Sequence, residues 1–255
     1  MTDHPIPPVP DEGAAAPGGA LPTGGPLTTV WQAFLDPVAA FRALAVRPQW
    51  LWALVVIVLV SLATQVVVSS RIDMESTIRQ GIEERQRDNQ ELTDAQVEQA
   101  VKAARAISRV AMVSAPIAVP IVFALLAGIY LGMLRLVGSD IGFSSAFATA
   151  LHAALPPALV SSVLTVVVVL QREALRISEM KGLVKSSLAA LLPDGTSKPL
   201  AALASVVDIF NVWQWVLLVL GFSIVGRVRR GQAVAVVAVA WGAWALLRAG
   251  LAMMR

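Results

Sequence analysis

The sequence contains no cysteine, so disulfide bonds and thiol chemistry are excluded for this chain. Its two histidines, His4 and His152, are too few for a metal site built from several imidazoles. Only 15% of the 255 residues are charged, whereas an ordinary soluble domain has about 25%. Because 56% of the residues are hydrophobic, the polar residues could not cover a soluble core. We therefore expect lipid to surround much of the chain.

The sequence also lacks the common catalytic patterns. It contains no P-loop, GxGxxG, HExxH or GxSxG motif, so we expect no catalytic residues, no cofactor, no metal and no enzymatic activity. The net charge is +3, but the lysines and arginines are interleaved with nearly as many acids along the chain. We interpret them as membrane flanks and solvated loops, and we expect no nucleic-acid partner.

The first predicted region is residues 1–29, which are rich in Pro, Gly and Ala and show no apolar period. We predict that this tail is disordered and that residues 30–255 form the membrane domain. Between residues 29 and 49, apolar residues recur at steps of three and four, which predicts a short amphipathic helix interrupted near Pro37 and ended by Pro48. Such a helix either lies in the membrane interface or packs on the rest of the protein, and the pattern favours neither.

Long apolar stretches then predict the fold class. A helix needs roughly 20 apolar residues to cross a bilayer, and five stretches provide the core of such a helix. The sequence therefore predicts an all-α, polytopic transmembrane helical bundle with five spans and two extramembrane helical loops. The predicted spans cover about residues 48–70, 110–134, 145–170, 209–226 and 233–252, and the loops cover 71–109 and 172–208.

The two long loops are too charged to enter lipid. Residues 71–109 predict a helical hairpin or stalk, in which Thr93 and Gln96 have the spacing of a capping box. An apolar stripe follows them, so one helix is expected to continue into the second span. In the second loop, residues 193–199 predict a turn between two short helical pieces.

Small residues predict close helix packing at two places. Gly128 and Gly132 form a small-xxx-small pair in the second span, and Ala238 and Gly242 belong to a similar face in the fifth. We favour packing within the chain for the glycine pair, and a homo-oligomer is the alternative.

Sparse polar residues in or beside the spans form the candidate intramembrane site. They are Gln65, His152, Asp208, Asn211 and Gln214. An ionisable residue inside a span is a functional candidate, and the last three share about 120° of one helical face. The structural alternatives are that His152 bonds to a neighbouring helix, that Asp208 caps a helix N-terminus, and that Asn211 and Gln214 bond across helices.

Three segments carry a resemblance to a known family. They are FLDPVAAFRALAVRPQW at 34–50, ELTDAQVEQA at 91–100 and VVDIFNVWQWVLLVLGFSIVGR at 206–227, of which residues 208–213 are the most specific. With them the chain resembles the bacterial branch of the Yip family over residues 31–252. These are five-span membrane proteins whose eukaryotic relatives interact with Ypt/Rab GTPases. The sequence has no Asp-Leu-Tyr-Gly-Pro stretch, and its only tyrosine is Tyr130, so Rab binding is not carried over.

The orientation depends on this resemblance. The side of the N-terminus holds six arginines, whereas the opposite side holds the other fourteen of the 20 lysines and arginines. A plain count places that second side in the cytoplasm. The resemblance implies the reverse, a cytoplasmic N-terminus and an extracytoplasmic C-terminus in the bacterial cytoplasmic (inner) membrane. The short, purely basic loop 227–232 also favours a cytoplasmic N-terminus.

Two functional hypotheses follow. The first is a non-enzymatic membrane protein that organises or binds membrane components, with the lipid bilayer and membrane proteins or further copies of itself as partners. The second is a small permease or channel for a solute, ion or lipid that uses the polar set around His152 and Asp208, because proline-broken helices often border binding cavities. Pro116, Pro120, Pro156 and Pro157 supply such breaks.

Overall fold

A computed structural model describes residues 25–72, 93–172, 186–193 and 195–254. Throughout these ranges the chain is helical, apart from turns and one isolated bridge between Ser187 and Asp208. The predicted all-α class is confirmed. Most of the predicted tail and large parts of both predicted loops lie outside the described residues. The end of the predicted tail is wrong by a few residues, because the first helix already begins at Pro26.

Four helices are long and apolar enough to cross a membrane within the described residues. They are α3 (Leu51–Arg71), the Pro116–Leu136 part of α5 (Asp94–Leu136), α6 (Phe143–Leu170) and α9 (Arg230–Met253). The fourth predicted span (209–226) forms α8 (Ile209–Val225), an apolar helix of 17 residues. At a rise of about 1.5 Å per residue, α8 is roughly 25 Å long, at the short end of spanning lengths.

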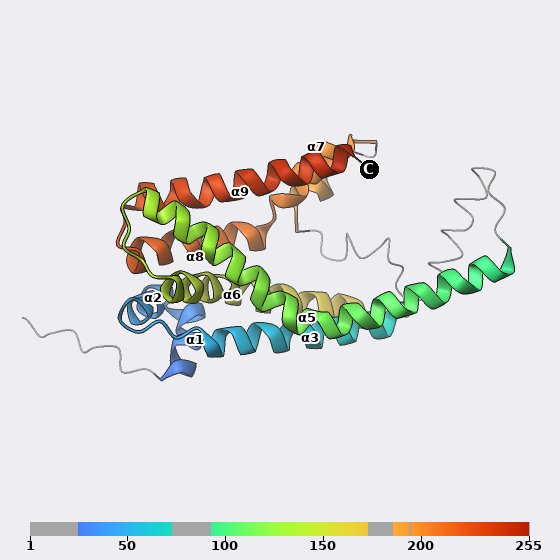
Figure 1. Cartoon of the computed structure of the whole chain (residues 1–255), viewed down its shortest axis with the longest axis horizontal. Coiled ribbons are helices and arrows are strands. Elements are labelled where there is room, and N and C mark those ends of the chain that lie inside the picture. The colour runs from blue at the N-terminus through green and yellow to red at the C-terminus, as the bar shows by residue number, and fades with distance from the viewer. Residues whose placement is uncertain (1–24, 73–92, 173–185, 194, 255) are drawn as a thin grey trace, which may run out of the picture.

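Successive long helices run in opposite directions along the bundle (Figure 1). The chain enters at the end that holds α1 (Pro26–Leu35) and α2 (Pro37–Val46), and it leaves at the opposite end after α9. We call these the N-terminal end and the far end. Residues 137–142 and 226–229 also lie at the N-terminal end, so the first and last described helices, α1 and α9, end on opposite sides of the bundle.

Helix α6 is the central helix, and it contacts α3, α5 and α8 as well as α1 and α2. Every residue from Ala146 to Pro157 is buried, which is unusual for a helix with a lipid-facing side. Many of these residues are alanines, whose small side chains let several helices approach together. The second half of α6 exposes apolar side chains such as Val163 and Leu170.

Helices α1 and α2 confirm the predicted helical pattern and its break. Pro37 begins α2, and the carboxylate of Asp36 caps it by accepting the N–H of Ala39 at 3.0 Å. Phe41 and Leu44 are fully buried in the core with α8, so the pair packs on the bundle. Its other side leaves Trp31 and Leu35 exposed.

The sequence predicted that the helix after Thr93 in the first loop continues into the second span, and this is confirmed. Helix α5 runs for 43 residues through Pro116 and Pro120. At its start the Gln96 side chain accepts the backbone N–H of Thr93 at 2.9 Å, as the capping pattern predicted. The predicted turn at 193–199 is also confirmed, since it separates the short helix Leu188–Leu191 from α7 (Lys198–Val206).

Candidate functional site

Asp208 begins α8 at the far end of the bundle, and its carboxylate is committed to hydrogen bonds. One oxygen, Oδ1, accepts the backbone N–H of Phe210 at 2.8 Å, and Oδ2 accepts the hydroxyl of Ser186. The backbone N–H of Leu188 adds a bond to the carbonyl of Val207 at 2.9 Å. Asp208 therefore caps α8, as the structural alternative predicted, and it also fastens the segment before α7.

Asn211 and Gln214 follow Asp208 on the same side of α8. The side-chain amide of Asn211 donates to the carbonyl of Val206 at 3.1 Å, so it bonds to the end of α7 rather than across to another span. Gln214 is half-buried one turn further on. Asp208 and Asn211 thus organise the connection from α7 into α8.

His152 lies elsewhere, in the buried half of α6, where it is only 1% exposed. Its Nδ1 is 2.9 Å from the carbonyl of Ala148 in the same helix. Because a carbonyl only accepts, this nitrogen carries the proton, which leaves Nε2 with a free lone pair. Nε2 has no hydrogen-bond partner among the described residues. The bond of His152 is therefore within its own helix and not to a neighbouring one.

The predicted polar set does not form one site. Thr149 of α6 lies opposite Gly221 of α8, and the two helices run in opposite directions. At about 1.5 Å per residue, His152 and Asp208 are therefore separated by roughly 15 Å along the bundle axis. Gln65 is half-buried in the last third of α3, which packs on α5 and α6.

A hollow between α7 and the last turns of α9 gathers residues that the sequence did not associate. Its volume is about 900 Å³, and it opens to the surface. Its polar lining comes from Ser187, Lys198, Ser205, Asp208 and Arg248, and its apolar lining includes Ala202, Leu251 and Ala252. Both cationic and apolar groups thus face one space, a combination that suits an amphiphilic group. We call it the α7–α9 hollow.

The sequence does not reveal the α7–α9 hollow, because it predicts a loop over 172–208 and a membrane flank at Arg248. The available signal was the small-residue spacing of Ala201, Ala202 and Ser205 in α7, which matches the small residues of α9. Ala245 and Ala249 of α9 are buried, and α7 packs against α9. A much smaller cavity of about 20 Å³ lies between α3 and α6, enough for roughly one water molecule.

Packing within the chain at Gly128, Gly132, Ala238 and Gly242 is not found among the described residues, and the homo-oligomer alternative stays a prediction. A methyl group added at Gly128, Gly132 or Gly242 would meet no atom within 4 Å, and Ala238 is exposed. Close approach occurs instead at Gly221, where an added Cβ would lie 2.6 Å from Cγ2 of Thr149 and 2.8 Å from the Phe41 ring. The outer glycine faces remain open to lipid or to another helix.

Comparison with known proteins gives one match. The Yip1 domain family matches residues 31–251, which is most of the chain. No curated protein and no solved structure matches it.

Proposed function

This chain belongs to the Yip1 domain family, an assignment from which we propose that it is a non-enzymatic integral membrane protein that binds membrane components and so organises them. The apolar helices and the family match make it an integral membrane protein. The observation that supports a binding role is the α7–α9 hollow, which is large, open and lined by both charged and apolar groups.

The chemistry of the α7–α9 hollow favours binding over catalysis. Its one carboxylate, Asp208, already accepts the N–H of Phe210 and the hydroxyl of Ser186. A general base needs its lone pair directed at the substrate, whereas this carboxylate holds a helix start. Arg248 supplies a permanent positive charge beside Leu251 and Ala252. A lipid headgroup with its first methylene groups, or a short polar segment of a membrane protein, fits this lining.

The proposed location is the bacterial cytoplasmic membrane, with the N-terminal end in the cytoplasm. The basic loop after α8 and Arg135 support this orientation, because short basic loops are retained in the cytoplasm. The α7–α9 hollow then faces the extracytoplasmic side. Partners are membrane lipids, membrane proteins or a second copy of the chain, which the open faces at Gly128 and Gly132 would admit.

The test is to isolate the full chain in mild detergent or in lipid nanodiscs and to identify co-purifying lipids and proteins by mass spectrometry. Ala252→Trp fills the α7–α9 hollow, and Ala243→Trp adds the same bulk at an exposed position of the same helix. We expect a specific component with the wild type and Ala243→Trp but not with Ala252→Trp. Repeated recovery of the wild type without any specific component would contradict the proposal.

A small permease or channel is the second candidate, and the unpartnered Nε2 of His152 favours it. Pro156 and Pro157 follow this residue in α6, and neither can donate a backbone hydrogen bond to the preceding turn. Several polar atoms are thereby available at membrane depth. Purified protein in liposomes should then move a solute or ion, and His152→Ala should abolish the flux. Equal flux in the wild type and in His152→Ala would eliminate His152 as part of a pathway, and equal flux in Asp208→Asn would eliminate Asp208.

A further inference from the structure

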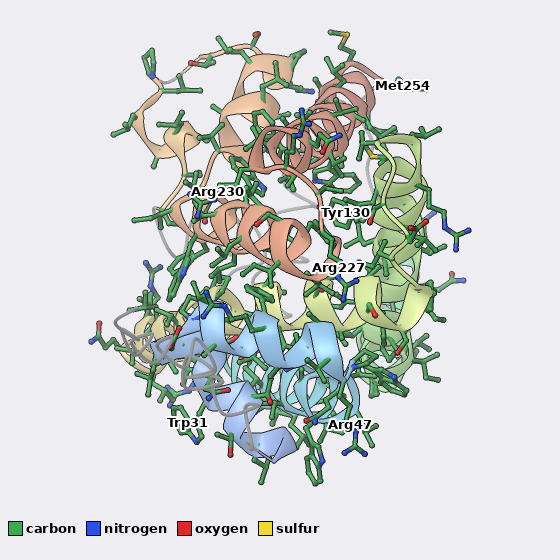
Figure 2. The ribbon with its side chains drawn as sticks, turned by 90° about the vertical axis from the view of Figure 1, so that its left-hand side faces the viewer. Trp31, Arg47, Tyr130, Arg227, Arg230 and Met254 are labelled. Carbon is green, nitrogen blue, oxygen red and sulfur yellow. The ribbon has the colours of Figure 1, made fainter. Side chains whose placement is uncertain are left out.

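Six arginines from three distant parts of the sequence meet at the N-terminal end of the bundle. Arg42 lies in α2, Arg47 is the C-cap residue of that helix, Arg135 lies in the last turn of α5, and the others belong to the connection into α9. Figure 2 looks onto this end, where Arg47, Arg227 and Arg230 are labelled together with Trp31. All six side chains are exposed. We call the set Arg42, Arg47, Arg135, Arg227, Arg229 and Arg230 the arginine surface.

Few acids balance the arginine surface. Among the described residues, Asp36 and Asp140 are the acids at this end, and Asp36 is used as the cap of α2. No ion pair within the described ranges includes any of the six arginines. The surface therefore carries an excess positive charge that attracts anions.

The connection that carries three of these arginines is held firmly. The hydroxyl of Ser139 donates to the carbonyl of Gly226 at 2.6 Å, and the side-chain amide of Gln232 donates to the carbonyl of Val137 at 3.1 Å. Val228 is buried between its arginine neighbours. Arg227 has φ of 52°, in the left-handed region that non-glycine residues rarely adopt. These contacts fix the backbone that carries Arg227, Arg229 and Arg230.

The position of Arg229 and Arg230 is electrostatically unfavourable in the isolated chain. They are the N-cap and the first residue of α9, and its first turn contains no acid. A helix N-terminus is the positive end of the helix dipole, so it disfavours cations and attracts anions. Arg135 and Arg227, at the ends of α5 and α8, complement the negative ends of those helices instead. An anion beside α9 would relieve the repulsion at Arg229 and Arg230.

Apolar side chains identify which anion fits. Trp31 is 67% exposed, Leu35 83% and Leu136 88%, all at the same end of the bundle as the arginines. Exposed indole and leucine groups beside arginines match the headgroup boundary of a bilayer, where phosphates adjoin acyl chains. A soluble anion or a nucleic acid would satisfy the arginines but not these side chains.

We propose that the arginine surface binds the phosphate groups of anionic membrane lipids, chiefly through Arg229 and Arg230, with α1 inserted at the same end of the bundle. This inference deepens the proposed function, since it names a lipid class as one bound component. It is nevertheless independent of the α7–α9 hollow, which lies at the far end. The arginine variants should lose lipid binding at the arginine surface and keep binding at the α7–α9 hollow, and Ala252→Trp should do the reverse.

The experiment reconstitutes the full chain in nanodiscs made from phosphatidylglycerol and phosphatidylcholine and measures the lipids retained around it. Both leaflets have the same composition, so an altered insertion direction does not affect the result. We expect phosphatidylglycerol to be enriched around the wild type. Arg229→Gln with Arg230→Gln should reduce the enrichment at least about fivefold, because each arginine near the surface adds measurably to anionic-lipid binding. The Lys versions of both residues should retain most of it.

A matched double variant, Arg71→Gln with Lys102→Gln, removes two positive charges at the far end and should retain the enrichment. An equal loss in both double variants, loss in the Lys variant, or no enrichment with the wild type would overturn the proposal. Excess inorganic phosphate should not displace the lipid beyond the effect of chloride at equal ionic strength. Displacement by phosphate alone would show that free phosphate, not a lipid, is the ligand. If the Gln pair unfolds, Arg230→Gln alone should still lower the enrichment.

Discussion

At the scale of single residues, Gly221 allows α8 to approach α6 closely in the core. It faces Thr149 of α6 and the buried ring of Phe41 in α2. Three elements therefore converge on a point where no side chain fits. By contrast, the glycines that a sequence pattern singles out in α5 and α9 adjoin open space.

Gly221→Ala is expected to destabilise the protein by about 1–3 kcal/mol, because the new methyl group would overlap Thr149 and Phe41. Thermal unfolding in detergent would measure the change. Gly242→Ala is the control, since its methyl group meets nothing within 4 Å. Thr149→Ser removes the overlapping Cγ2 and should recover part of the loss in the double variant. Equal melting temperatures for the two alanine variants would refute the role of Gly221.

His152→Leu should leave the stability unchanged or raise it by up to about 2 kcal/mol. The variant removes a buried nitrogen that has no partner among the described residues, and such a group costs about 1–3 kcal/mol. The carbonyl of Ala148 still accepts its helical N–H. Thermal unfolding without added solute is the measurement. A clear decrease in melting temperature would mean that Nε2 is satisfied by a bound group.

At the scale of helices, the ends are fixed by particular side chains. Asp36 starts α2, Gln96 closes the first turn of α5, and Asp208 starts α8. Asp208 has the further task of holding Ser186, so one carboxylate joins the extramembrane segment to a membrane helix. The edge of the α7–α9 hollow depends on this joint.

Asp208→Ala should lower the stability by about 1–2 kcal/mol, the usual cost of removing a helix cap. Asp208→Asn should be nearly neutral, because an asparagine oxygen caps as well as an aspartate oxygen. Thermal unfolding of the two variants in the same detergent would separate capping from charge. A large loss in Asp208→Asn would indicate that the negative charge itself is required.

Phe41→Ala should cost about 3–5 kcal/mol, because its ring is fully buried where α2 meets α6 and α8. Leu35 of α1 is 83% exposed, so Leu35→Ala should have little effect on unfolding in detergent. The comparison tests whether the N-terminal helices belong to the bundle. Equal effects would mean that α1 and α2 are held by lipid alone.

At the scale of the whole molecule, α1 lies at one end of the bundle and α9 finishes at the other. The two ends also carry different arrangements of charged side chains. The N-terminal end holds the arginine surface, whereas the far end holds the α7–α9 hollow, with Lys198, Arg248 and Asp208. Two chemically different surfaces are thus presented to the two sides of one membrane.

Reporter fusions after residues 20, 138 and 229 should report one compartment, and fusions after 90, 190 and 255 the other. Five passes through the membrane require this alternation. The protein should also remain in vesicle membranes after alkaline carbonate extraction. If 190 and 229 reported the same side, α8 would not span the bilayer, and the short length of that helix would be the reason.

The sequence by itself determined the helices, their approximate ends and their membrane character. Apolar runs, proline breaks and caps such as Thr93 with Gln96 are properties of neighbouring residues, so they can be recognised without a fold. The same local logic predicted the continuous α5 and the cap at Asp208, because each depends on residues within one or two turns.

Only the tertiary structure decided which surfaces meet. The docking of α7 on α9 places Lys198 and Arg248 in the lining of one hollow, although 50 positions separate them in the sequence. The crossing of α6 and α8 selects Gly221, not Gly128 or Gly132, as the close contact. Such choices depend on the relative rotation and level of helices distant in sequence, which hydrophobicity leaves undetermined because lipid and protein neighbours are equally apolar. The separation of His152 from Asp208 and the gathering of the six arginines have the same origin.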